Sequence, residues 1–134
     1  MSAPTIFDTD AEETVAGCAA FSEVAARACT DRLRLEHFRD PRCWAVVAAS
    51  LEVPNDRPAE VDAAGGWWRE HRIADTAHIP RPVLEDWCRQ APLAYDAVAR
   101  YAHRVIAAYG RRQRVAVLLE ELAEHGVRIE WEAA

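Results

Sequence analysis

The chain has 134 residues, enough for one packed core and too few for two ordinary domains. Hydrophobic residues make up 51% of it, but charged residues interrupt every apolar stretch, so we expect no membrane span. The net charge of -6 argues against a dedicated nucleic-acid binder, which needs a surplus of positive charge to contact phosphates. Residues 1–10 lack the basic start and apolar middle of a secretory signal, so a soluble, cytoplasmic protein is expected.

The four cysteines are widely and irregularly spaced, with no Cys-x-x-Cys pair and no histidine at the spacing of a metal finger. They lie among alanine, valine and tryptophan, where a thiol packs as a small apolar group. We therefore predict free, buried thiols, no metal site and no cofactor. The cysteines are Cys18, Cys29, Cys43 and Cys88.

The first half of the chain contains signals for three helices. Thr9 to Glu12 fits a capping box, in which the Thr9 hydroxyl accepts the Glu12 amide, so a helix is predicted to begin there. A second helix is predicted from about Ser22 to Cys29, ended by Thr30-Asp31. Asp40-Pro41 predicts the start of a third, with aspartate as the cap and proline in the first turn.

The middle of the chain is less regular. Residues 54–58 predict a turn because they hold two prolines with Asn and Asp between them. Residues 60–72 predict a helix weakened by two glycines, and residues 75–82 predict a loop. Pro82, or the residue before it, should then open a helix that ends before Pro92.

A long helix is predicted from Leu93 to about His125, with Gly126 ending it. Gly110 is a candidate kink or break. Apolar positions follow a heptad pattern, interrupted by an arginine. Apolar residues outside the heptad positions widen the apolar face of this helix. We therefore expect one side of it to contact the helix's own domain and the other side to contact a partner. The heptad positions, including the interrupting arginine, are Ala94, Val98, Tyr101, Val105, Ala108, Arg112, Val115, Leu119 and Leu122.

Together these elements predict an all-α fold, a compact bundle of about five to six helices with a long C-terminal helix. We expect a single domain over residues 1–134, with a flexible N-terminus over residues 1–8 and a short tail over residues 127–134.

The sequence offers little catalytic chemistry. Every basic residue other than histidine is arginine, so the lysine of an ATP-binding phosphate loop is missing. Glu36-His37 near Cys43 is the strongest enzymatic candidate, because histidine activates a thiol when the two are in contact. A histidine at the end of a helix connection is more often structural, and we predict no catalytic residues and no enzymatic activity.

Two features could contact nucleic acid. Arg111 and Arg114 are candidate phosphate contacts, although nearby glutamates make an ordinary solvated helix face the favoured interpretation. Tryptophans could stack on bases, but a place in the core is commoner. Because Trp67 and Trp68 are adjacent, both cannot point inward from a helix, and one of them is a candidate partner anchor.

Four short motifs follow one another along most of the chain. They are Ala11-Glu12-x-x-Val15-x-Gly17, Phe21-x-x-Val24, Phe38-x-x-Pro41, and Tyr101-Ala102-x-Arg104-Val105-Ile106 followed by Arg111-Arg112. In order and spacing they resemble the N-terminal domain of DnaB-type replicative helicases, here without the ATPase motor. In that family the domain hydrolyses nothing, forms dimers in a collar above the motor ring, and helps to recruit primase and loaders. The resemblance implies an adaptor, loader or modulator of a replicative helicase or primase.

For such an adaptor we expect a homodimer or higher oligomer, with nucleic acid contacted at most indirectly. Arg112 should pair with a carboxylate across the interface or set its register. The alternatives are a structural homodimer of phage or mobile-element origin and a helical DNA-binding regulator. The predicted partner-contact residues are Tyr101, Val105, Ala108, Arg112, Val115 and Leu119.

Overall fold

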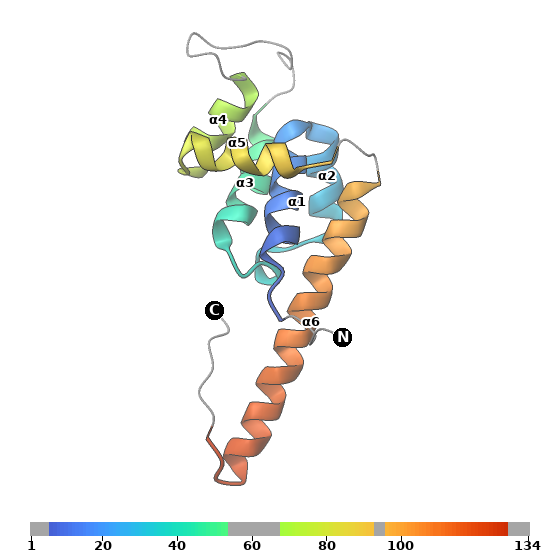
Figure 1. The fold of residues 1–134 in the computed structure, drawn as a ribbon, viewed down its shortest axis with the longest axis vertical. Coiled ribbons are helices and arrows are strands. Elements are labelled where there is room, and N and C mark those ends of the chain that lie inside the picture. The colour runs from blue at the N-terminus through green and yellow to red at the C-terminus, as the bar shows by residue number, and fades with distance from the viewer. Residues whose placement is uncertain (1–5, 54–67, 93–95, 129–134) are drawn as a thin grey trace.

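The computed structural model describes residues 6–53, 68–92 and 96–128, and these ranges contain α-helices, one short 3-10 turn and no strand. The predicted all-α fold with a long C-terminal helix is confirmed (Figure 1). The elements are α1 (Thr9–Phe21), α2 (Glu23–Arg32), η1 (Leu35–His37), α3 (Pro41–Glu52), α4 (Trp68–Ala77), α5 (Arg81–Gln90) and α6 (Ala97–Glu124).

Helix α1 is the centre of the body and contacts each of the other α-helices. Its alanines allow this, because small side chains let helices approach closely, and Ala11, Ala16 and Ala19 are fully buried. Gly17 permits the closest approach: a Cβ at this position would lie 2.2 Å from the backbone oxygen of Trp87 in α5. The α1–α5 crossing therefore depends on this glycine.

Helix α1 begins at Thr9, where a helix start is predicted, but its cap differs from the prediction. The cap is Asp8, whose side chain accepts a hydrogen bond from the Ala11 amide at 3.1 Å, and Thr9 is already helical. Glu12 is buried and accepts from the Asp40 amide at 2.9 Å, so it reaches across to the start of α3. The predicted capping box between Thr9 and Glu12 is wrong because Asp8 is the cap and the Glu12 carboxylate bonds to Asp40 instead.

The residues before α1 are held against the body. The Ile6 carbonyl accepts a hydrogen bond from Arg112, and the Arg39 guanidinium lies 4.1 Å from the centroid of the Phe7 ring. In the predicted flexible N-terminus, residues 6–8 are thus anchored by specific contacts, and residues 1–5 lie outside the described part of the chain.

Asp8 forms a two-pronged ion pair with α6, since Arg104 Nη2 and Nε lie 2.8 and 2.9 Å from its two oxygens. Burial acts to raise the Asp8 pKa, but bonds from Arg104 and Ala11 and the charges of Arg104 and Arg111 outweigh it and lower the pKa. A lowered folded-state pKa means that this stability is present above about pH 4 and is lost as the pH falls through the folded pKa.

Replacing Asp8 with Asn is therefore expected to cost about 1 kcal/mol of unfolding free energy at pH 7, since asparagine keeps the cap and loses the ion pair. Below the folded-state pKa of Asp8 the variant and the native chain should converge, and urea denaturation at pH 7 and at a pH well below 4 measures the difference. An equal cost at both pH values would show that the ion pair contributes nothing.

The limits of α2 and α3 show what local signals predict. Helix α2 continues through Thr30 and Asp31, so the predicted break there is wrong; Thr30 Oγ1 donates to the Arg27 carbonyl at 3.0 Å and leaves the helix intact. Helix α3 begins as predicted, with the Asp40 side chain accepting from the Arg42 amide and Pro41 in the first turn.

Helix α4 runs to Ala77, so the predicted loop over residues 75–82 is confined to His78–Pro80. His78 has a φ of 58°, a left-handed conformation that ends the helix without a glycine. Helix α5 starts at Arg81 with Pro82 in its first turn, as predicted. The predicted turn at residues 54–58, most of the predicted helix over 60–72, and Trp67 lie outside the described residues.

A buried arginine joins three helices. Arg69 in α4 is 4% exposed and donates hydrogen bonds to the carbonyls of Ala20 and Ser50, at 3.2 and 2.9 Å, and to that of Val53. These carbonyls lie at the C-terminal ends of α1 and α3, where helices leave acceptors unpaired and carry partial negative charge. Arg69 therefore supplies the polar partners that allow these two helix ends to be buried.

The cysteines are free, with Cys18, Cys29 and Cys43 buried and Cys88 partly so, as predicted. Burial raises the pKa of the Cys29 thiol to about 12 and keeps it protonated. None of the described helices combines the length and the apolar composition that crossing a bilayer requires.

Candidate interaction surface

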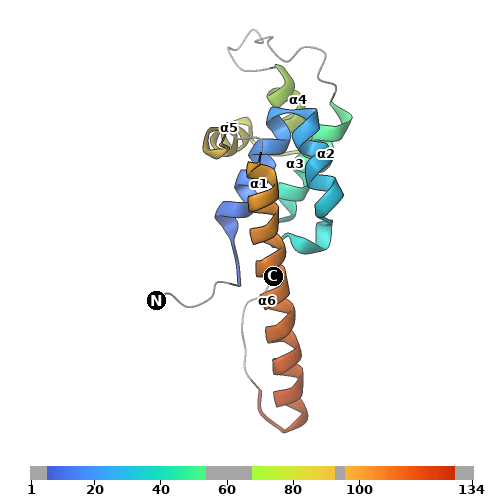
Figure 2. The same ribbon diagram turned by 90° about the vertical axis from the view of Figure 1, so that its right-hand side faces the viewer.

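Helix α6 has two halves with different surroundings. Up to Arg112 one side of it is buried against α1, α2 and η1. After Arg112 no described residue of the helix is buried. Figure 2 shows this second half extending beyond the body, and we call residues 113–124 the arm.

The arm carries apolar side chains that its own body leaves accessible. Val117, Leu118 and Leu122 are 52%, 56% and 37% exposed. Val115 and Leu119 are half-buried. Twelve residues of helix span about 18 Å. Helices in proteins draw most of their stability from packing of an apolar face, and the body leaves the faces of Val117, Leu118 and Leu122 accessible. A projecting helix with clustered apolar residues is typical of a surface that another protein covers.

The predicted contact residues divide between the two halves of α6. Val105 and Ala108 are each 1% exposed and belong to the domain's own packing, so they offer no surface to a partner in this structure. Tyr101 is half-buried beneath Arg104, whose guanidinium lies 5.0 Å from the ring centroid. Only Val115 and Leu119 belong to the arm. The heptad positions thus contribute to the core in the first half of α6 and to the accessible surface in the arm.

Arg112 does not have the role expected from its place in the heptad pattern. It is 7% exposed and donates to the backbone carbonyls of Ile6 and His37, at 2.8 and 3.0 Å. It therefore attaches the N-terminal segment and η1 to α6 within one chain. The expected carboxylate across an interface is replaced by these internal carbonyls.

The candidate phosphate contacts lie where the arm leaves the body. Arg114 is exposed, and Arg111 is half-buried and acts electrostatically on Asp8. Glu120, Glu121 and Glu124 follow along the arm and are all exposed. The arm is therefore basic near the body and acidic towards its end.

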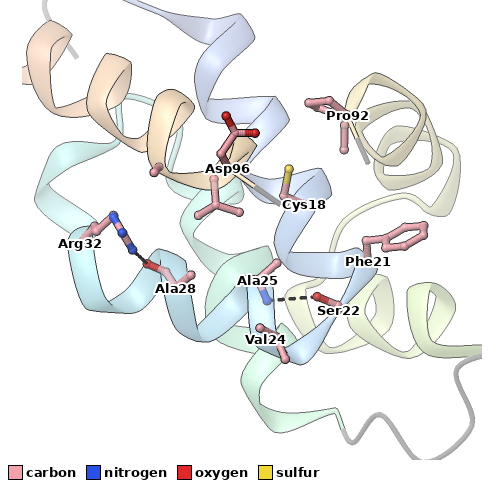
Figure 3. A pocket seen from close by; sticks show the side chains of 12 residues that line it. Cys18, Phe21, Ser22, Val24, Ala25, Ala28, Arg32, Pro92 and Asp96 are labelled. Carbon is pink, nitrogen blue, oxygen red and sulfur yellow. Dashed lines mark hydrogen bonds between the residues drawn. The ribbon is translucent and has the colours of Figure 1, made fainter. Parts of the chain in front are cut away.

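A second accessible feature is a groove between the end of α1, α2, the residues just after α5 and the start of α6 (Figure 3). Its volume is about 530 Å³, and Phe21 and Val24 at its edge are 56% and 64% exposed. Sequence reasoning missed this groove; the only signal was a pair of apolar residues on either side of the α1–α2 junction. The lining residues are Cys18, Phe21, Ser22, Val24, Ala25, Ala28, Arg32, Ala91, Pro92, Asp96, Val98 and Ala99.

The candidate catalytic group does not assemble. The Nδ1 atom of His37 accepts a hydrogen bond from the Arg34 amide at 2.9 Å, and the ring packs against Tyr109 at a centroid distance of 5.0 Å. Cys43 is fully buried, and burial raises the pKa of its thiol. Within the described part of the chain, no three histidine, cysteine or carboxylate side chains are placed to hold a metal ion.

These observations define a small all-α domain whose projecting helix is its most distinctive surface. In comparisons with known proteins, no family model, curated protein or solved structure matches the chain. The resemblance to the helicase N-terminal domain therefore rests on the sequence motifs alone.

Proposed function

We propose that this chain is a non-enzymatic protein-interaction domain that serves DNA replication as an adaptor, loader or modulator of a replicative helicase or primase. The arm is its docking element. The observation that carries the proposal is the group of exposed apolar side chains, Val117, Leu118 and Leu122, on the part of α6 that extends beyond the body (Figure 1).

The replication context is supported by the motif resemblance, and the structure gives those motif residues physical roles. Ala11 and Val15 are fully buried, Gly17 permits the α1–α5 contact, and Glu12 bonds to the start of α3. These residues maintain a scaffold. A scaffold of this kind supports an analogy with the function of the helicase N-terminal domain, but it does not specify the partner. The partner must therefore be identified by experiment.

The expected result of an affinity capture from a lysate of the native host is recovery of a replicative helicase, its loader or primase with the tagged chain. Leu119→Asp should abolish this recovery, because it places a charge among the apolar side chains of the arm, beyond the last residue buried against the body. Mass spectrometry of the captured proteins measures the effect.

Val24→Asp is the matched control, since it introduces the same charge at an exposed apolar residue on the body, at the edge of the groove. It should leave recovery unchanged, and both variants should keep the native helical circular dichroism. Recovery of no replication protein by the native chain would overturn the proposed function. Loss with Val24→Asp alone would move the docking surface to the groove.

A further inference from the structure

We propose that the arm pairs antiparallel with the arm of a second copy of this chain, in a two-fold symmetric dimer held in register by Arg114 and Glu121. This inference rests on the proposed function in one respect, that the arm is a docking element. It goes further by naming one occupant of the arm and its orientation.

The order of charges along the arm favours a second copy. Arg114 and Glu121 lie about two helical turns apart on one face, and both are exposed. They are equally distant from the midpoint between Val117 and Leu118. In an antiparallel pair centred on that midpoint, each Arg114 faces the second copy's Glu121, so one contact forms twice by symmetry. A parallel pair would instead place like charges together.

The same register fits the length of the arm. It brings Glu124, the last residue of α6, opposite Arg111 of the other copy, next to Arg112, the last residue of α6 that the body buries. The overlap therefore fills the free part of the helix, on the order of 20 Å, and stops where the body begins.

An apolar stripe runs beside these charges. Val115, Leu118 and Leu122 follow one another at steps of three and four residues, the spacing of a helix-pairing seam. Arg114 and Glu121 each precede a residue of this stripe, which places them at its edge, where flanking charges set the partner and the direction of helix pairs. A short overlap of this kind predicts a weak dimer, with a dissociation constant on the order of micromolar.

The test is sedimentation equilibrium of the full chain over a wide concentration range. The native chain should show a monomer–dimer equilibrium. Arg114→Glu alone and Glu121→Arg alone should each weaken the dimer by about tenfold or more, since each replaces two attractive pairs with two repulsive ones. The double variant Arg114→Glu/Glu121→Arg should restore the native dissociation constant, because the facing charges are opposite again. Arg89→Glu, at an exposed site on α5, should leave it unchanged.

A native chain that stays monomeric at every concentration overturns the inference, as does a dimer that single charge reversals leave unchanged. Either result leaves the proposed function intact if the arm still captures a replication protein. A dimer that behaves as predicted, together with no replication protein in the capture experiment, would instead retain this inference and overturn the proposed function.

Discussion

Replacing Arg69 with methionine is expected to lower the free energy of unfolding by about 3 kcal/mol or more. Methionine fills much of the same space but donates no hydrogen bond. The carbonyls of Ala20, Ser50 and Val53 would lose their charged donor at two buried helix ends. Each buried acceptor left unsatisfied costs about 1–3 kcal/mol, and the three carbonyls share one side chain.

Urea denaturation followed by circular dichroism measures this change, and Arg72→Met in the same helix is the matched control. Arg72 is exposed, with its guanidinium 5.5 Å from the Trp68 ring centroid, so its replacement should change stability by less than about 1 kcal/mol. If both variants lose the same stability, Arg69 does not hold the helix ends together.

The second large effect is expected from Gly17→Ala. Helix propensity alone predicts stabilisation by about 1 kcal/mol, because alanine is the better helix former. Packing predicts the opposite: the new Cβ would lie 2.2 Å from the Trp87 oxygen and 2.7 Å from its carbonyl carbon. Both are backbone atoms, so α1 and α5 must separate. We expect a net loss of about 2–4 kcal/mol, measured by thermal or urea denaturation.

Gly110→Ala provides the control of opposite sign. A Cβ there meets only the Arg114 guanidinium, at 3.6 Å, which is an ordinary contact. Since Gly110 lies within the continuous helix α6, alanine should stabilise the chain by about 0.5–1 kcal/mol. Stabilisation by Gly17→Ala of similar size would contradict the close α1–α5 contact.

Local signals in the sequence were enough where the residues that form a helix end are neighbours in the chain. Asp40-Pro41 starts α3 as predicted. Gly126, with a φ of 81°, ends α6, and the Val127 amide bonds back to the Leu122 carbonyl at 2.9 Å. Gly110 neither breaks nor splits α6, which is continuous from Ala97 to Glu124.

The same local signals could not predict contacts between residues that are distant in the sequence. Arg69 bonds to residues of α1 and α3 that are distant in sequence, and in the sequence it is one of many arginines on helix faces. Glu12 matched a local capping pattern and instead bonds to Asp40. In both cases the partner is set by how the helices pack.

The candidate surface was predictable only in part. The heptad spacing continues past Arg112, from Val105, which the body buries, to Leu119, which lies on the arm. Periodicity indicates that one face of a helix is apolar, but it does not indicate whether the domain itself or a partner covers that face. Where the body ends, just after Arg112, is a property of the tertiary structure, and it determines which part of the stripe is left for a partner.

The most direct test of the arm as a docking surface is site-specific photo-crosslinking in the native host, with a photoreactive phenylalanine analogue at Leu118 and, in a second strain, at Val24. We expect adducts from Leu118 that contain a replication protein or a second copy of the chain, and far fewer from Val24. Adducts from Val24 with none from Leu118 would contradict docking through the arm and assign the docking surface to the groove on the body.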